Sequence, residues 1–110
     1  MSNSDLLKPI TPGEILREDF MEPMGISMNK LSRDIDVPTN RISEIVNGKR
    51  GITADTALRL ERYFGVEAQF WLNLQSEYDL RIIKRKIGSD IEKRILPVKK
   101  QPSQSRPTGA

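Results

Sequence analysis

Hydrophobic residues recur at helical spacing along most of this chain, and no segment alternates apolar and polar positions for long enough to predict a strand. Four helical segments are bounded by proline or glycine: 11–23, 27–35, 39–47 and 53–64. A fifth and longest segment, predicted to end near Gly88, carries a continuous apolar stripe. Its members are Trp71, Leu74, Tyr78 and Ile82. The chain is therefore predicted to be all-α, with a compact core of five helices.

The predicted helix ends have recognisable chemistry. Thr11 and Glu14 match a capping box, and Thr53 is placed to cap the fourth helix. Gly48 and Gly65 follow the third and fourth helices, where a left-handed residue commonly ends a helix.

The sequence after Gly88 has a different character. Residues 89–96 could form one more short element, and from Pro97 onward proline, serine, glutamine and lysine dominate, which predicts disorder. We therefore divide the chain into a flexible N-terminal segment, 1–10, a folded domain, 11–87, and a C-terminal extension, 88–110, disordered from about residue 97.

The composition argues against several classes of function. The chain has 110 residues, enough for one domain, and no cysteine or histidine, which removes disulfides, zinc fingers, thiolate nucleophiles and Ser-His-Asp triads. Its acidic residues are scattered at helix-surface spacings. We therefore expect neither an enzyme nor a bound metal or cofactor. No apolar run approaches the roughly 20 residues of a membrane span, and the N-terminus lacks a signal-peptide layout, so we expect a cytoplasmic protein that does not bind membranes.

Positive charge is concentrated towards the C-terminus. Residues 81–110 hold nine Lys and Arg against two acidic side chains, a net charge of +7, whereas residues 1–80 hold nine against thirteen, a net charge of −4. This asymmetry favours an anionic partner, with nucleic acid first. A solvated tail without a partner explains the last dozen residues equally well.

Residues 27–50 have the layout of a helix-turn-helix unit, with two short helices joined by a three-residue break. The second helix of such a unit can enter the major groove of B-DNA, where its N-terminal residues reach base edges. The candidate base-contacting residues are Thr39, Asn40, Arg41 and Ser43. An asparagine amide matches adenine, and an arginine guanidinium matches guanine. The candidate phosphate-contacting residues are Ser27, Lys30, Asn47, Lys49 and Arg50.

Taken singly, each of these residues is an ordinary polar residue on a helix surface or loop. The combination of helix lengths, break length and polar face is what favours DNA binding. A different class of function is the alternative to DNA binding: an interaction module that neutralises a partner without binding DNA.

Three stretches of the chain carry a resemblance to a known family: TPGEILREDFMEPMGIS at 11–27, VPTNRISEIVNGKRGITADTALRL at 37–60 and FWLNLQSEYDL at 70–80. They resemble the HigA-type antitoxins, a branch of the XRE class of bacterial helix-turn-helix regulators with a lambda-repressor-like domain. The general class shares only the middle stretch, whereas the PGEIL opening and the FWLNLQ segment are typical of this branch.

The resemblance implies a homodimer that represses its own operon by binding a palindromic operator. It also implies a toxin partner, a small basic RelE-like ribonuclease that cleaves mRNA and is neutralised in the complex. It carries the recognition role onto the four base-contact candidates above and a phosphate-contact role onto Asn47. A stand-alone XRE-type repressor without a toxin is the alternative.

Two residues depart from the family pattern. Asp36 stands where the turn often has glycine, but aspartate tolerates a left-handed conformation, so the fold is not threatened. Met28 stands where many members place a DNA-contacting glutamine, and it is therefore left out of the candidate site.

Dimerisation would place two recognition helices about 34 Å apart, one turn of DNA. We assign the dimer interface to the fifth helix because it carries more apolar surface than one core-facing stripe uses. The candidate interface residues are Phe70, Leu72, Leu74 and Tyr78.

Overall fold

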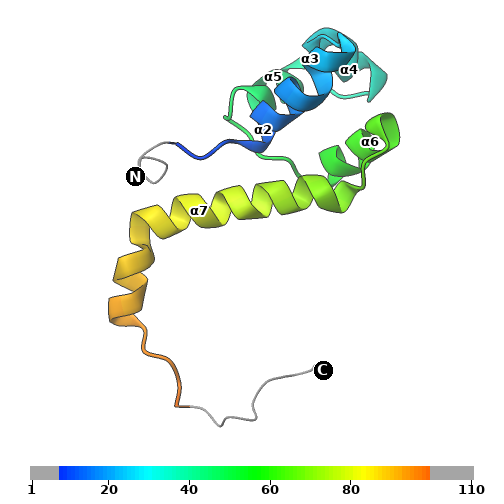
Figure 1. The fold of residues 1–110 in the computed structure, drawn as a ribbon. Coiled ribbons are helices and arrows are strands. Elements are labelled where there is room, and N and C mark those ends of the chain that lie inside the picture. Colours follow the sequence, from blue (N-terminus) through cyan, green and yellow to red (C-terminus); the bar gives the residue numbers. More distant parts are fainter. Residues whose placement is uncertain (1–7, 100–110) are drawn as a thin grey trace.

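The computed structural model describes residues 8–99, and within this range the chain is entirely helices and connecting loops, without a strand (Figure 1). The first helical run has three parts, α2 (Pro12–Ile15), the π-helical segment η1 (Leu16–Met21) and α3 (Glu22–Met24). It is followed by α4 (Met28–Asp34), α5 (Thr39–Val46), α6 (Ala54–Phe64) and α7 (Ala68–Arg94). These described residues form the five-helix arrangement predicted from the sequence.

The first run begins with the predicted capping box. Thr11 Oγ1 accepts from the Glu14 N–H at 3.1 Å, and Glu14 Oε1 accepts from the Thr11 N–H at 3.0 Å. Pro23 lies inside the run rather than at its end, and left-handed Gly25, with φ of 67°, ends it. The sequence pattern did not predict the wider π-helical turns of η1.

The turn between α4 and α5 has the conformation expected from its sequence. Asp36 adopts a left-handed backbone with φ of 61°, which confirms that aspartate accepts the position where glycine is frequent. Ser27 caps α4 by accepting a hydrogen bond from the Lys30 N–H at 3.0 Å. Thr53 occupies the N-cap position of α6, but its side chain makes no capping hydrogen bond.

One hydrophobic core joins all five runs. Its fully buried members come from each of them: Leu16, Leu31, Ile42, Ile45, Leu60 and Trp71. The first run approaches α5 so closely that a Cβ built on Gly13 would lie 1.8 Å from the backbone oxygen of Ile45. Glycine is required here because any side chain would separate the two helices.

Helix α7 is longer than predicted. It continues through Gly88 to Arg94 without interruption, so the predicted end near Gly88, and a separate short element over 89–96, are wrong. Figure 1 shows its first half lying along the other helices and its second half extending past them, with a bend before the last turns. Residues 95–99 have no regular secondary structure. The predictions of flexibility before residue 8 and disorder after residue 99 lie outside the described residues.

Between residues 8 and 99, no helix is both long and apolar enough to cross a membrane.

Candidate nucleic-acid interface

Helix α5 is anchored on one side and open on the other. Ile42, Ile45 and Val46 are buried in the core, whereas Thr39 and Asn40 in its first turn are exposed. The preceding helix α4 is buried through Leu31 and Ser32. The first turn of α5 is therefore a polar surface held by a rigid base, which is the arrangement that presents a recognition helix to the major groove.

A hydrogen-bonded pair joins the two helices across the turn. Ser32 Oγ donates to the Asn29 backbone oxygen at 2.9 Å and lies 3.2 Å from Thr39 Oγ1. Since a hydroxyl has one proton, Thr39 is the donor to Ser32 when Ser32 donates to Asn29. The Thr39 side chain then has its methyl group and the remaining acceptor capacity of its oxygen available, but not its hydroxyl proton.

Three of the candidate residues have side chains with no hydrogen bond or ion pair to another residue in the range 8–99. They are Asn40, Asn47 and Lys49, and all are exposed. Ser43 is half-buried, and its hydroxyl donates to the Asn40 backbone oxygen at 3.3 Å. Among the four base-contact candidates, Asn40 is thus the residue whose side chain has no partner within the described range.

Arg41 is engaged within the protein. Its Nη1 atom forms a short ion pair with Asp55 Oδ2 in the first turn of α6. Asp55 also accepts from Arg59 Nε, at 3.2 Å to Oδ1 and 3.1 Å to Oδ2. Hydrogen bonds from these two arginines hold the pKa of Asp55 below its usual value, Arg41 contributing most.

Two of the predicted phosphate contacts are paired with acids. Lys30 Nζ lies 2.9 Å from Asp34 Oδ2, and Arg50 lies 2.7 Å from Glu44 Oε1 through its Nη2 atom. The Tyr63 hydroxyl donates to Asp34 at 2.6 Å, and together with Lys30 it lowers the pKa of that carboxyl. Exposed pairs of this kind are weak, so they leave both cations able to exchange partners for a phosphate.

A residue from α7 holds the loop that carries several of these candidates. Gln75 Oε1 accepts a hydrogen bond from the Ile52 N–H at 2.8 Å, and its Nε2 atom donates to Asp79 at 3.0 Å. The loop after α5 is thereby tied to the FWLNLQ segment, of which Gln75 is the last residue. This contact could not be predicted from local sequence patterns because the two partners are 23 residues apart.

Asp55 and Arg59 were also missed by the sequence analysis. Their spacing of four residues indicates an ion pair along one helix, but the link to Arg41 depends on how α5 and α6 pack. No spacing rule could have found that link.

The predicted dimer residues divide into two groups. Leu72 and Leu74 are half-buried against the core of the same chain, and Tyr78 is half-buried beside residues 8–11. Phe70 is 36% exposed, but its ring packs against Trp71 with ring centroids 5.0 Å apart. These residues mainly complete the chain's own fold.

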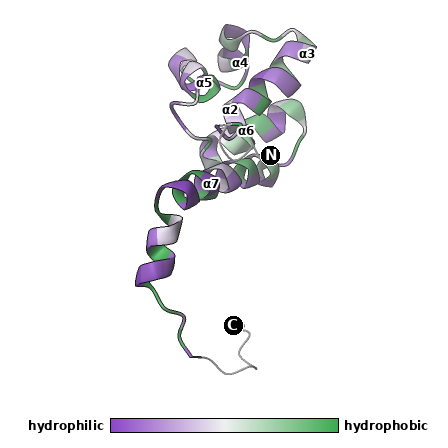
Figure 2. Cartoon of the chain, turned by 60° about the vertical axis from the view of Figure 1, so that its left-hand side comes forward, coloured by the Kyte–Doolittle hydropathy of each residue, from purple (hydrophilic) through white to green (hydrophobic). Residues whose placement is uncertain are grey.

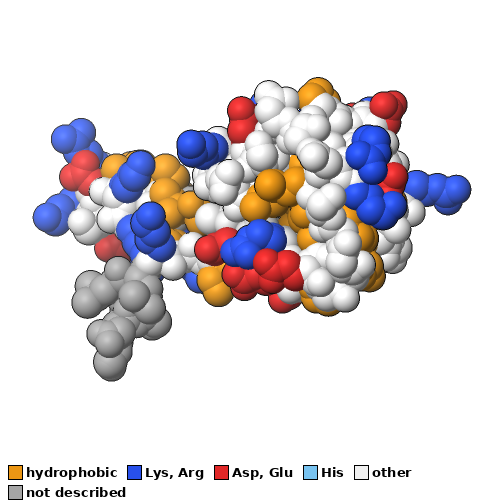
Figure 3. Space-filling model, turned by 90° about the horizontal axis from the view of Figure 1, so that it is seen from above, with side chains coloured by type: hydrophobic (Ala, Val, Ile, Leu, Met, Phe, Trp, Pro, Cys, Tyr) orange, Lys and Arg blue, Asp and Glu red, His pale blue; other side chains and the backbone are white. Residues whose placement is uncertain are grey.

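The exposed apolar surface of α7 lies further along the helix. Its members are Leu80, Ile83, Ile87 and Ile91, which we call the outer stripe, and each is at least 41% exposed. Leu80 follows Trp71 by nine residues, roughly two and a half helical turns, so the outer stripe lies opposite the core-facing stripe. Green segments continue along the projecting part of α7 in Figure 2, and in Figure 3 orange side chains lie between blue Lys and Arg side chains there.

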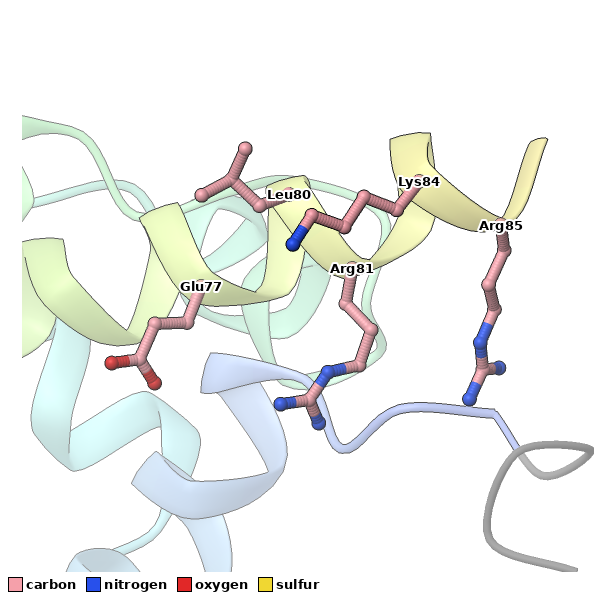
Figure 4. Close-up of a pocket in the computed structure, with 5 residues that line it drawn as sticks. All are labelled: Glu77, Leu80, Arg81, Lys84 and Arg85. Carbon is pink, nitrogen blue, oxygen red and sulfur yellow. The ribbon is translucent and has the colours of Figure 1, made fainter. Parts of the chain in front are cut away.

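The basic residues of α7 flank this stripe. A shallow pocket on the helix is lined by Glu77, Leu80, Arg81, Lys84 and Arg85. Figure 4 shows Arg81 and Arg85 pointing towards the side of α7 on which the chain enters α2, with Leu80 on the other side of the helix. The projecting part of α7 thus carries an apolar stripe with cationic side chains beside it.

Taken together, the packed helix pair, the polar first turn of α5 and the supported loop after it define a helix-turn-helix DNA-binding domain. Similarity to known proteins agrees, because the helix-turn-helix family matches residues 18–71. Virulence-associated protein I of Dichelobacter nodosus is 57% identical over 76 residues, covering 69% of this chain and 70% of that protein.

Two further relatives are antitoxins. Antitoxin HigA-1 of Vibrio cholerae serotype O1 is 38% identical over 73 residues, covering 66% of this chain and 69% of that protein. The solved structure of Pseudomonas aeruginosa antitoxin HigA with the higBA promoter has a TM-score of 0.80 and 48% sequence identity, covering 82% of this chain and 98% of that one. The chain belongs to the HigA-type antitoxin family of helix-turn-helix proteins. This is a family of DNA-binding regulators rather than enzymes, as the sequence predicted.

Proposed function

We propose that this protein is the antitoxin of a type II toxin-antitoxin pair and that, as a dimer, it represses its own operon by binding a palindromic operator. The observation that carries the DNA-binding part is the exposed first turn of α5. There the Asn40 amide has no partner among residues 8–99, and the helix is anchored by the buried side chains of Ile42 and Ile45. The Pseudomonas relative of the same fold, solved with the higBA promoter, supports DNA binding.

The proposed DNA surface extends from α5 to its flanks. Asn40 and Arg41 read base edges, Thr39 and Ser43 add contacts in the groove, and the phosphate contacts come from the helix ends and the loop. These phosphate contacts are Ser27, Lys30, Asn47, Lys49 and Arg50. The cation–acid pairs at Lys30 and Arg50 are exposed and weak, so both side chains can exchange the acid for a phosphate.

We place the dimer interface on the outer stripe of α7 rather than on the four residues predicted from the sequence. Leu72 and Leu74 already pack against the core of the same chain, whereas Ile83 and Ile87 are exposed on a helix that extends beyond it. A twofold arrangement uses the same face of both copies, so the outer stripe of one copy packs against the outer stripe of the other. The palindromic operator follows from this symmetry.

The toxin assignment rests on the family. The partner is a small basic RelE-like ribonuclease that cleaves mRNA, and the pair acts in the cytoplasm.

The test is a tagged pull-down from the intact native locus, with intact-mass analysis of the proteins that co-purify. Recovery of a stoichiometric small basic protein, encoded by the neighbouring reading frame, supports the antitoxin assignment. Expression of that protein alone should arrest cell growth, and co-expression of this chain should relieve the arrest. A homodimer without a companion would contradict the antitoxin assignment and leave a stand-alone repressor.

A further inference from the structure

Three charged side chains form a cluster where the first turns of α5 and α6 meet: Arg41, Asp55 and Arg59. Asp55 pairs with both arginines. Arg59 also donates from Nη1 to the backbone oxygens of Ile35 at 2.8 Å and Asp36 at 3.0 Å, at the end of α4. Asp55 is therefore braced by an arginine that is itself fixed to the helix-turn-helix turn.

The bracing leaves most of the Arg41 guanidinium unused. Only Nη1 contacts Asp55, and Nε and Nη2 have no partner within residues 8–99. A guanidinium has five N–H donors in a planar fork, and two of them suffice for the paired acceptors of guanine. The Arg41 side chain is held at one edge while the donors needed for a base remain free.

Holding a long side chain in place before binding reduces the freedom that must be lost when the complex forms. A carboxylate close to DNA would ordinarily repel phosphates, but Asp55 lies between two arginines that offset its charge. The arrangement suits orienting a base-reading arginine more than blocking it.

We propose that Asp55 is a positioning residue that orients Arg41 and thereby sets the preference of the protein for guanine at one base pair of its operator. This proposal rests on the proposed DNA-binding function. Asp55 itself touches no base. Its contribution is made through Arg41, and Arg59 of α6, which donates to the backbone oxygens at the end of α4, supports Asp55 from the other side.

The test begins with a DNA duplex selected from random sequence by the wild-type protein. Affinities are then measured for this duplex, for single-base variants and for an unrelated duplex. Arg41→Ala identifies the base pair that Arg41 reads, since discrimination is lost there. Asp55→Asn, which removes the charge and keeps the shape, should lose about tenfold in discrimination at that same base pair. In the Arg41→Ala background, Asp55→Asn should cause no further loss.

A matched control removes a similar exposed ion pair elsewhere. Glu22→Gln breaks the pair with Arg17 on the first helical run, and it should leave discrimination unchanged at every base pair. A role of Asp55 in helix stability alone would lower the melting temperature without changing discrimination. Arg59→Gln keeps the Arg41–Asp55 pair but removes the ion pair that braces Asp55, so a smaller loss of discrimination is expected at the same base pair. This variant keeps the proposal testable if Asp55→Asn folds poorly.

Two results would overturn the proposal. Unchanged discrimination in Asp55→Asn would show that Asp55 does not orient Arg41, and tighter specific binding would show that it competes with DNA. If the wild-type protein enriches no sequence, the DNA-binding function itself fails and the assignment of Asp55 falls with it. The two failures are thus distinguishable in the first step.

Discussion

The two halves of α7 share one helical backbone but have opposite surroundings. In the first half, Trp71 is fully buried in a core shared with the other helices. In the second half, Ile83 and Ile87 are 45% and 44% exposed on a face turned away from that core. Helical spacing therefore identifies residues that share a face but does not identify what covers that face. The first half completes the fold of one chain, and the second half carries the surface on which we propose that a second copy packs.

The largest expected effect is on stability, and it contrasts a glycine in the packed helices with a glycine in the projecting half of α7. Gly13→Ala places a Cβ against the backbone of Ile45, which cannot move as a flexible side chain would, and should destabilise the protein by about 3 kcal/mol. Gly88→Ala meets nothing closer than 3.7 Å within a helix and should stabilise it by about 0.5–1 kcal/mol. Urea denaturation measures both. Equal effects would mean that the close approach at Gly13 is wrong.

A second prediction concerns the outer stripe. Ile87→Glu should weaken the dimer by at least about 2 kcal/mol, because an apolar side chain is lost from the interface in both copies. The unfolding of the monomer should change little. Sedimentation equilibrium measures the association, with Lys86→Ala at the neighbouring exposed position as the control. A wild-type monomer at high micromolar concentration, or an unchanged dimer in Ile87→Glu, would place the interface elsewhere.

A third prediction compares cations of the two regions. Lys49, in the loop after α5, has no acidic partner among residues 8–99, and Lys49→Gln should reduce the slope of log affinity against log salt by about 1. Lys93→Gln, near the far end of α7, should leave the slope unchanged. An equal reduction from both variants would show that the projecting half also neutralises phosphates.

The smallest expected effect is the pH dependence of Asp34. The pKa of its carboxyl is lowered by the Tyr63 hydroxyl and Lys30, so the ionised form is favoured in the folded state. Its stabilisation is present above the ordinary value of 3.8 and is lost as the pH falls through the lower folded value. The melting temperature of Asp34→Asn should therefore be slightly below that of the wild type at pH 7 and should match it in stronger acid. Asp90→Asn, on the projecting half, should differ little from the wild type at pH 7. A difference that persists for Asp34→Asn in strong acid would contradict this assignment.

Much of the packed part of the fold could be predicted from the sequence because the patterns that determine it involve neighbouring residues. The capping box at Thr11, the cap at Ser27 and the left-handed turn at Asp36 each depend on a few neighbouring residues. The burial of Ile42 and Ile45 on one side of α5 follows from helical spacing.

The remaining features depend on contacts between distant segments. Arg41 was predicted to face DNA freely, but its partner Asp55 comes from another helix. Leu72 and Leu74 were predicted to lie at a dimer interface, and the sequence could not show that they also pack, half-buried, against the chain's own core. The end of α7 was misplaced because Gly88, a weak helix former, is tolerated inside a helix.

The central claim is that the first turn of α5 reads DNA sequence, and Asn40 tests it most directly because its amide is exposed and unpaired within the described chain. The measurement is the affinity of Asn40→Ala for the selected duplex and for an unrelated duplex of the same length at one salt concentration. We predict a loss of about 1–3 kcal/mol on the selected duplex, localised to one adenine, with little change on the unrelated one. Equal affinities of the variant and the wild type for the selected duplex would contradict the account.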